Sequence, residues 1–227
     1  RGAMLETYHD GTQEVVGTVF IDDCQWDRSA EWNYRGSVPA PDLVNGCKPI
    51  TGTNRAIITK GQWGFGIIDV SFSVTDPSKS GFIVTFGWNG VGDPTGSLGL
   101  NCYQLNIFHN YLRIVRIIDG QASGGTTDTT FSMIAGKIYN VRIVHGSTLD
   151  VFVDGTHMIS LTTSGFNSGY VTFGQYNSVG TKIYNIQIIA ASSDATNGIA
   201  ACIPPIGGGA RYGVEESVYI PITPGTE

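Results

Sequence analysis

The chain has 227 residues, of which 41% are hydrophobic and 14% are charged, and its formal net charge is −6. This apolar content suffices for one sizeable core, and β-sandwiches of such length are routinely single domains. No run of about eighteen apolar residues is present, so the sequence predicts no membrane span. Nucleic acids usually bind a basic stripe, which this acidic chain lacks, so no nucleic-acid partner is expected.

Strand patterns fill the middle of the chain. Apolar and polar residues alternate repeatedly, which is typical of half-buried β-strands, and no amphipathic helical pattern stands out. The clearest stretch is 138–162, where Asp154-Gly155 predicts a hairpin turn because both residues accept positive φ cheaply. The predicted strands cover residues 15–21, 55–59, 66–74, 82–88, 100–108, 111–118, 139–143, 149–153, 159–161, 169–175 and 182–190.

Polar and Gly- or Pro-rich stretches separate and flank these strands. A Gly-rich loop is expected at 87–97 and a polar loop at 119–130. About a dozen short strands favour an all-β sandwich. We expect an N-terminal arm at residues 1–14, a sandwich at 15–191 and an extended Pro/Gly-rich C-terminal arm at 192–227. That last arm is either a tail without fixed structure or a segment that adds a strand to another copy.

Four cysteines lie at positions 24, 47, 102 and 202, with a spacing that matches no zinc motif. An even number in a Gly-rich, weakly charged β-chain favours disulfides and an extracellular setting over free thiols. Of the three pairings that four cysteines allow, we favour Cys24–Cys47 and Cys102–Cys202. Cys102 is expected to face away from the core side of its strand, where a crossing C-terminal arm would reach it.

Short motifs occur along the chain in a set order. They are FIDD (20–23), W (32), VNG (44–46), NR (54–55), WGFGIIDV (63–70), CYQLNI (102–107), YNVRI (139–143), LDVFVDG (149–155) and KIYNIQI (182–188). This series resembles the laminin-G-like branch of the concanavalin-A-like lectin/glucanase superfamily over residues 15–191. One departure is Cys24, which stands where these domains often carry an apolar aromatic residue and so favours a local disulfide.

The resemblance implies a concanavalin-A-like jelly roll of two curved antiparallel sheets, with the first and last core strands adjacent. Such domains bind glycans or proteins, cleave polysaccharides or serve as spacers, and the fold does not choose among these roles. The function therefore has to be argued from particular residues.

Carboxylates on one strand are the signature of the polysaccharide-cleaving members. Retaining cleavage needs two such groups about 5 Å apart. The best match is Asp69, but Ser71 and Ser73 take the next positions on the same side of its strand. Asp150 and Asp154 also share a side, although Asp154 is better explained by its turn. A lone carboxylate cannot be both acid and nucleophile, so we do not expect an enzyme.

Calcium is the metal that the resemblance makes most relevant, because such domains hold it through loop carboxylates and carbonyls. Asp22, Asp23, Asn89 and Asp93 are the candidate ligands. Asp22 and Asp23 equally fit the end of a strand, where their carboxylates would bond the local backbone. The four histidines form no pair at ligand spacing, and no phosphate-binding or nucleophile motif is present.

Polar side chains on the outward side of several strands form a candidate glycan-binding surface. This set contains Asp69, Ser71, Ser73, Thr85, Gln104, Asn106 and Arg142. If their strands are neighbours in one sheet, the surface suits hydroxyl-rich ligands; otherwise it is an ordinary solvated face. Sugars also stack on exposed rings, for which Trp63, Tyr111 and Tyr176 are candidates because they lie near loops, whereas Trp88 is expected to point into the core.

Three functions follow from these patterns. The first is a non-catalytic structural subunit of an extracellular assembly, such as a surface filament or a virion decoration, with arms packing on neighbouring copies. The alternative is a carbohydrate-binding or adhesion module, and the third is a polysaccharide-cleaving enzyme. The expected partners are other copies, a neighbouring assembly protein or a glycan, and the expected location is extracellular, at a cell or virion surface.

Overall fold

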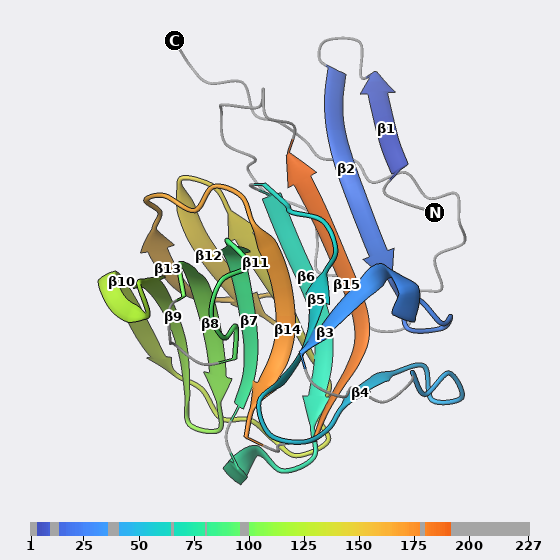
Figure 1. The fold of residues 1–227 in the computed structure, drawn as a ribbon. Coiled ribbons are helices and arrows are strands. Elements are labelled where there is room, and N and C mark those ends of the chain that lie inside the picture. The colour runs from blue at the N-terminus through green and yellow to red at the C-terminus, as the bar shows by residue number, and fades with distance from the viewer. Residues whose placement is uncertain are drawn as a thin grey trace.

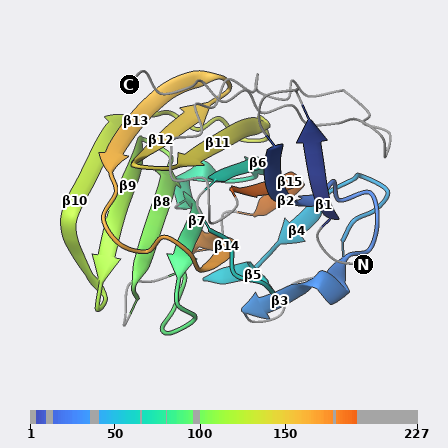
Figure 2. The same ribbon diagram turned by 90° about the horizontal axis from the view of Figure 1, so that it is seen from above.

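The computed structural model describes residues 4–9, 14–35, 41–64, 66–79, 81–95, 100–177 and 180–191. Within these ranges the chain forms fifteen β-strands, two short 3-10 turns and no α-helix. The strands assemble into two antiparallel sheets that face each other (Figures 1 and 2). The predicted all-β sandwich is confirmed. None of the described segments is a helix that could cross a membrane.

The eight-stranded sheet has the order β1-β2-β15-β6-β11-β12-β13, and the short β4 pairs with β15. β2 and β15 are adjacent and antiparallel, as the family resemblance implied for the first and last core strands. The bounds are β1 Met4–His9, β2 Glu14–Asp22, β4 Lys48–Ile50, β6 Gly66–Val74, β11 Tyr139–His145, β12 Thr148–Val153, β13 Thr156–Thr162 and β15 Thr181–Ala191.

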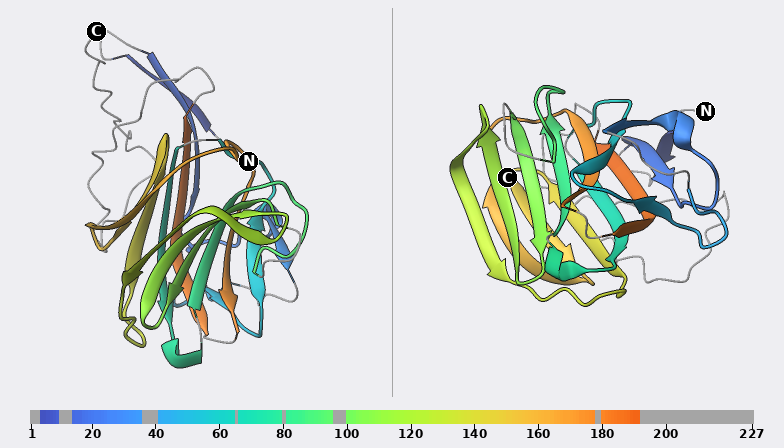
Figure 3. Two further views of the ribbon diagram at one scale, coloured as in Figure 1. Left: turned by 90° about the vertical axis from the view of Figure 1, so that its left-hand side faces the viewer. Right: turned by 60° about the horizontal axis from the view of Figure 1, so that its bottom comes forward.

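The seven-stranded sheet has the order β10-β9-β8-β7-β14-β5-β3 and lies against the first (Figure 3). The two sheets approach each other along β10 and β13. The bounds are β3 Trp32–Arg35, β5 Arg55–Thr59, β7 Gly81–Trp88, β8 Cys102–Phe108, β9 Tyr111–Ile118, β10 Gln121–Thr130 and β14 Tyr170–Tyr176.

The core fills the space between the sheets, because alternate residues of each strand point inward. Val70 and Ile143 enter it from the eight-stranded sheet, and Leu105 and Ile114 enter it from the seven-stranded sheet. All four are almost inaccessible to solvent. The residues between them on each strand point to the outer faces of the sandwich, where a ligand has access.

The predicted hairpin at Asp154-Gly155 is confirmed. It joins β12 to β13, and both residues have positive φ, at 49° and 79°. The Asp154 carboxylate accepts a hydrogen bond from the backbone N–H of Asn140 at 2.9 Å and pairs with Lys137 at 2.9 Å. Asp154 thus serves the turn, as the sequence suggested.

Three strands lie where the sequence predicted loops or irregular structure. β10 occupies the predicted polar loop at 119–130; its composition is polar because it is an edge strand, and a bulge between Ala122 and Thr126 interrupts its register. β3 is also an edge strand, and β4 contains Pro49, which is tolerated because β4 pairs on one side only. Edge strands need little apolar alternation, so their sequences resemble loops.

The predicted arms lie largely outside the described residues. Within the predicted N-terminal arm, β1 pairs with β2 of the same chain. The predicted C-terminal arm at 192–227 falls wholly outside the described part. The division into arms and sandwich therefore stays a prediction.

Candidate functional site

The predicted polar surface is divided between the two outer faces of the sandwich. Asp69 and Arg142 lie on β6 and β11 of the eight-stranded sheet, whereas Gln104 and Asn106 lie on β8 of the seven-stranded sheet. The condition set for one shared surface, that these strands are neighbours in one sheet, is therefore not met. Alternation shows which residues share a side of a strand, but it does not show which sheet the strand joins.

Asp69 and Arg142 form a buried, bidentate ion pair. Arg142 donates from Nε to Oδ1 of Asp69 at 2.7 Å and from Nη2 to Oδ2 at 2.8 Å, and the side chains are 8% and 13% exposed. The pair ties β11 to β6, where the two residues are opposite each other. A carboxylate held by two charge-assisted hydrogen bonds is poorly placed to act as an acid or a nucleophile.

Asp150 of β12, in the same sheet, is also engaged. Asp150 accepts hydrogen bonds from Thr148 and Ser160, and His157 Nε2 lies 3.2 Å from its Oδ1. Partial burial raises the pKa of Asp150, but these hydrogen bonds outweigh it and hold the pKa below its usual value. Ser160 and Asp150 contact the same nitrogen of His157, whereas a catalytic triad needs them on opposite nitrogens.

Three aromatic rings lie together on the seven-stranded sheet, at the end next to the His109–Asn110 turn. We call Phe108, Tyr111 and Tyr176 the aromatic ledge. The ring centroids of Phe108 and Tyr111 are 4.8 Å apart, and those of Phe108 and Tyr176 are 6.5 Å apart. Tyr176 is 40% exposed, and the other two are half-buried. Phe108 and Tyr111 lie on the outer face, because their chain neighbours Ile107 and Leu112 point into the core. Tyr176 lies in the same row, since both Tyr176 and Phe108 pair with Gly81.

Gly81 of β7 shapes the ledge. It pairs with Tyr176 on one side and with Phe108 on the other, so a residue without a side chain separates the two rings. A Cβ at Gly81 would lie 2.4 Å from the carbonyl oxygen of Ile107 and 3.0 Å from the Phe108 ring. Only glycine leaves room for the two rings to approach each other across β7.

A charged pair borders the ledge on the side of β10. Arg113 donates from Nε to Oδ1 and from Nη2 to Oδ2 of Asp128, both at 2.7 Å. These bonds raise the pKa of Arg113 and lower the pKa of Asp128. The Arg113 guanidinium also lies 5.1 Å from the centroid of the Tyr111 ring, a cation–π distance. The side chains are 40% and 46% exposed, so their remaining donors and acceptors face solvent.

The loop that follows β7, described over residues 89–95, covers the centre of the same face. The carbonyl oxygen of Pro94 accepts hydrogen bonds from Thr85 at 2.8 Å and from Gln104 at 3.3 Å. Asp93 pairs with Arg35 of β3 at 2.5 Å. Gln104 is consequently only 6% exposed. It was a predicted glycan-binding residue, but this loop keeps a ligand on the outer face from reaching it.

Trp88 was expected to point into the main core, but it lies under the same loop instead. Gly87 has φ 63°, and the register between β14 and β7 shifts nearby, which turns Trp88 to the outer face. There it packs with Leu100 and Cys102, and its Nε1 donates to the carbonyl of Val91 at 2.7 Å. The bulge is a local backbone feature that alternation alone does not reveal.

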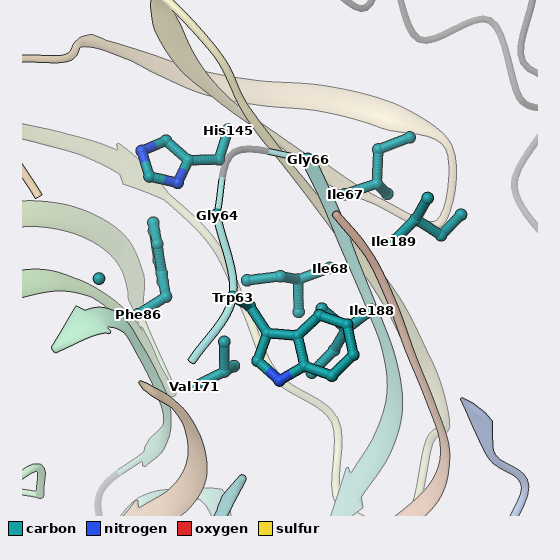
Figure 4. A pocket seen from close by; sticks show the side chains of 11 residues that line it. Trp63, Gly64, Gly66, Ile67, Ile68, Phe86, His145, Val171, Ile188 and Ile189 are labelled. Carbon is teal, nitrogen blue, oxygen red and sulfur yellow. The ribbon is translucent and has the colours of Figure 1, made fainter. Parts of the chain in front are cut away.

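Trp63, another predicted stacking residue, closes the end of the sandwich. Its backbone pairs with Gly169, its ring lies 6.0 Å from Phe20, and the ring packs on the core. Trp63 lines a cavity of about 10 Å³, room for roughly one water molecule, together with Phe86 and His145 (Figure 4). Burial lowers the pKa of His145 to about 4, so this imidazole is neutral at neutral pH.

The predicted calcium ligands are bound to protein groups. Asp22 accepts hydrogen bonds from Cys24 N and Trp32 Nε1 and pairs with Lys48; Asp93 pairs with Arg35. Asp23 and Asn89 cap the backbone N–H groups two residues ahead. Within the described ranges, no group of three or more His, Cys, Asp and Glu side chains comes together to hold a metal.

Cys24, Cys47 and Cys102 are free, buried thiols, so the structure does not contain the predicted Cys24–Cys47 disulfide. Cys24 belongs to the main core, whereas Cys47 lies outside that cluster, where its backbone pairs with Asp42. Cys102 faces away from the main core, as predicted, and packs in the outer apolar cluster with Trp88. Cys202 lies outside the described residues, and the Cys102–Cys202 pairing stays a prediction.

Of the predicted glycan-binding residues, the structure brings Asn106 and Tyr176 to the ledge region. Asn106 is opposite Arg113 on β9, although it is 7% exposed. Sequence reasoning missed Phe108, Arg113 and Asp128. Phe108 and Arg113 have the same parity as Asn106 and Tyr111, so alternation carried across the His109–Asn110 turn would have found them. Asp128 lay in the predicted polar loop.

Comparison with known proteins supports the fold. No protein-family model and no curated protein matches the chain. A carbohydrate-binding module, CBM66 from Bacillus subtilis, matches with a TM-score of 0.56 and 13% identity, over 69% of this chain and 94% of that chain. A Bacillus subtilis protein of unknown function with a galectin-like fold matches with a TM-score of 0.61 and 9% identity, over 76% and 94%.

The β-glucanase of Bacillus licheniformis matches with a TM-score of 0.56 and 12% identity, over 77% of this chain and 98% of that chain. At these identities the likeness shows the fold alone: this chain is a concanavalin-A-like jelly-roll β-sandwich. The fold is compatible with both binding modules and enzymes.

Proposed function

We propose that this protein is a carbohydrate-binding module, within the laminin-G-like branch that its sequence resembles, and that glycan lies on the aromatic ledge. The observation that carries the proposal is the alignment of Phe108, Tyr111 and Tyr176 on one face, at ring distances of 4.8 and 6.5 Å. Partly exposed rings next to fixed polar groups are the usual composition of a small-ligand site. The likeness in fold to the carbohydrate-binding module CBM66 supports the proposal.

Each group of the ledge has a role in this proposal. Tyr176 and Phe108 offer apolar ring surface to the C–H face of a sugar, while Gly81 lets the two rings lie close together. Arg113 and Asp128 are held in one plane by their two hydrogen bonds and present a donor edge beside an acceptor edge. Adjacent hydroxyls of a sugar ring both donate and accept, which matches that edge. An extracellular or surface location, where polysaccharides are met, belongs to the same proposal.

The test is a glycan array followed by calorimetric titration of the best ligand. Tyr176→Ala should weaken binding by about tenfold, in the range expected for an aromatic hot spot. Tyr34→Ala is the matched control, because Tyr34 is also an exposed tyrosine of the seven-stranded sheet, 37% against 40%, but lies on the edge strand β3. Array silence, or equal losses in both variants, would contradict the proposal.

A second control concerns the other exposed aromatic surface. Trp26 is 70% exposed on the loop after β2 and is the most exposed tryptophan in the described part of the chain. Trp26→Ala should leave the affinity unchanged. Loss of binding in this variant alone would move the site from the ledge to the loop after β2.

A further inference from the structure

We infer that the ledge takes a short, uncharged glycan segment of about three sugar units that runs across the strands. The inference rests on the proposed function and adds the orientation, length and charge of the ligand. It depends on three features of the outer face: the direction of the ledge, the covered region beside it and the neutralised charge at its border.

The ledge runs perpendicular to the strands. Its rings come from the end of β14, the end of β8 and the start of β9, with Gly81 of β7 in between. Neighbouring strands are about 4.8 Å apart, so the backbone beneath the row from Tyr176 to Tyr111 spans roughly 14 Å. The ring centroids lie closer together, at 6.5 and 4.8 Å from that of Phe108, which leaves at most about 11 Å between the outer two. One strand spacing is close to the length of one sugar unit in an extended chain. The row therefore accommodates about three units.

A ligand cannot extend along the strands from the ledge toward the centre of the sheet. The next row on the same face contains Asn106 and Ile83, which are 7% and 3% exposed. In the same row, Gly174 pairs with Ile83, and the loop after β7 approaches so closely there that a Cβ on Gly174 would lie 3.2 Å from the Thr95 side chain. Two residues along a strand correspond to about 7 Å, so the covered region begins within about one sugar unit of the rings.

In the opposite direction the strands end, at the His109–Asn110 turn and at Asn177. The backbone N–H of Asn177 is bound to the side chain of Asn54 at 3.1 Å, which fixes the turn beside Tyr176. A glycan that uses all three rings must therefore lie across the strands. Its contact length is limited by the width of the ledge.

The charge at the border favours an uncharged ligand. Both N–H groups that Arg113 directs at Asp128 are engaged at 2.7 Å, and each residue neutralises the other. The whole chain carries a net charge of −6, which repels anionic glycans at long range. A carboxylate or sulfate on the ligand would have to displace Asp128 from Arg113.

The length is tested by titration with the neutral oligosaccharide that the array identifies, in lengths of one to six units. Affinity should rise by several-fold per added unit up to about three units and change by less than about twofold from four to six. A steady rise to six units would overturn the inferred length while leaving the proposed function intact. Absence of binding to any glycan would overturn both.

The charge is tested with oligogalacturonates as anionic probe and with two matched variants. The wild type should bind oligogalacturonates at least about tenfold more weakly than the neutral series. Asp128→Asn frees Arg113, so it should weaken the binding of neutral oligosaccharides. It should also strengthen the binding of oligogalacturonates, and added salt should suppress this gain. Asp119→Asn, an exposed aspartate of the turn after β9, should change neither. Equal affinity of the wild type for both series, or no gain in Asp128→Asn, would overturn the inference.

Discussion

Asp22 and Lys48 form an ion pair with side-chain exposures of 0% and 1%, and their N–O distance is 3.1 Å. β2 ends at Asp22 and β4 begins at Lys48, and the two strands take successive parts of one edge of β15. The pair thus joins β2 and β4 where the two strands meet along one side of β15. Trp32 adds a third strand to this junction by donating to the same carboxylate at 2.7 Å.

Removing one partner of this pair should be costly. Lys48→Met leaves the Asp22 charge buried without its cation, and such changes cost about 3–5 kcal/mol of unfolding free energy. Urea denaturation followed by tryptophan fluorescence measures the loss. Lys137→Met, which breaks the exposed pair with Asp154, should leave the midpoint nearly unchanged. Equal effects of both substitutions would show that the buried pair does not support the junction.

Stability should fall with acid through His145. This imidazole lies between the rings of Phe86 and Tyr103, each 5.6 Å away, and burial lowers its pKa to about 4. Because the unfolded chain takes up the proton near pH 6.5, stability is complete above that value and declines as the pH falls toward 4. The full effect is about 3 kcal/mol.

The measurement is urea unfolding at pH 7, 6, 5 and 4 for wild type and His145→Phe. The unfolding free energy of the variant should depend less on pH than that of wild type over this interval, whatever its value at pH 7. Parallel pH profiles would show that other groups, and not His145, account for the acid sensitivity.

The buried thiols should resist modification. Burial, with Asp22 nearby, raises the pKa of Cys24, and burial raises the pKa of Cys102 to about 12. Thiolates are the reactive species, so iodoacetamide at pH 8 should leave both unmodified in the native protein and modify both in urea. Peptide mass spectrometry without reduction gives the readout. A Cys24–Cys47 cross-linked peptide would restore the disulfide that the sequence predicted.

The close approach of Tyr176 and Phe108 depends on Gly81. Gly81→Ala brings a Cβ within 2.4 Å of the Ile107 carbonyl oxygen, so β7 must move relative to β8 and the spacing of Tyr176 and Phe108 changes. We expect a lower melting temperature and weaker glycan binding. Gly61→Ala is the control, because no atom lies within 4 Å of its added Cβ. Unchanged binding in Gly81→Ala would mean that this ring spacing has no role.

The sequence predicted the central strands well because each alternates between core and solvent. The predicted limits 55–59, 66–74 and 111–118 coincide with β5, β6 and β9. The edge strand β10 was missed, since neither of its sides needs to be apolar. Local pattern thus identifies strands that lie inside a sheet more readily than strands at its edges.

The candidate site was predicted only in part. Asn106 was chosen by its side of the strand, and Tyr111 and Tyr176 were chosen because they lie near loops. Asp69 and Arg142 were grouped with Asn106 by the same alternation, although they belong to the other sheet. Strand pairing and the cover provided by the loop after β7 both depend on contacts between residues that are far apart in the sequence. Neither is encoded in the alternation of one strand, so the predicted surface could not be placed correctly.

The central claim is that glycan contacts the ledge on the outer face of the seven-stranded sheet. The most direct measurement is NMR titration of isotope-labelled protein with the array-selected oligosaccharide. Shifts should concentrate on Phe108, Tyr111, Arg113, Asp128 and Tyr176, while Trp26, Trp63 and Asp69 should not move. Shifts centred on the outer face of the eight-stranded sheet, or on the loop after β2, would contradict the account.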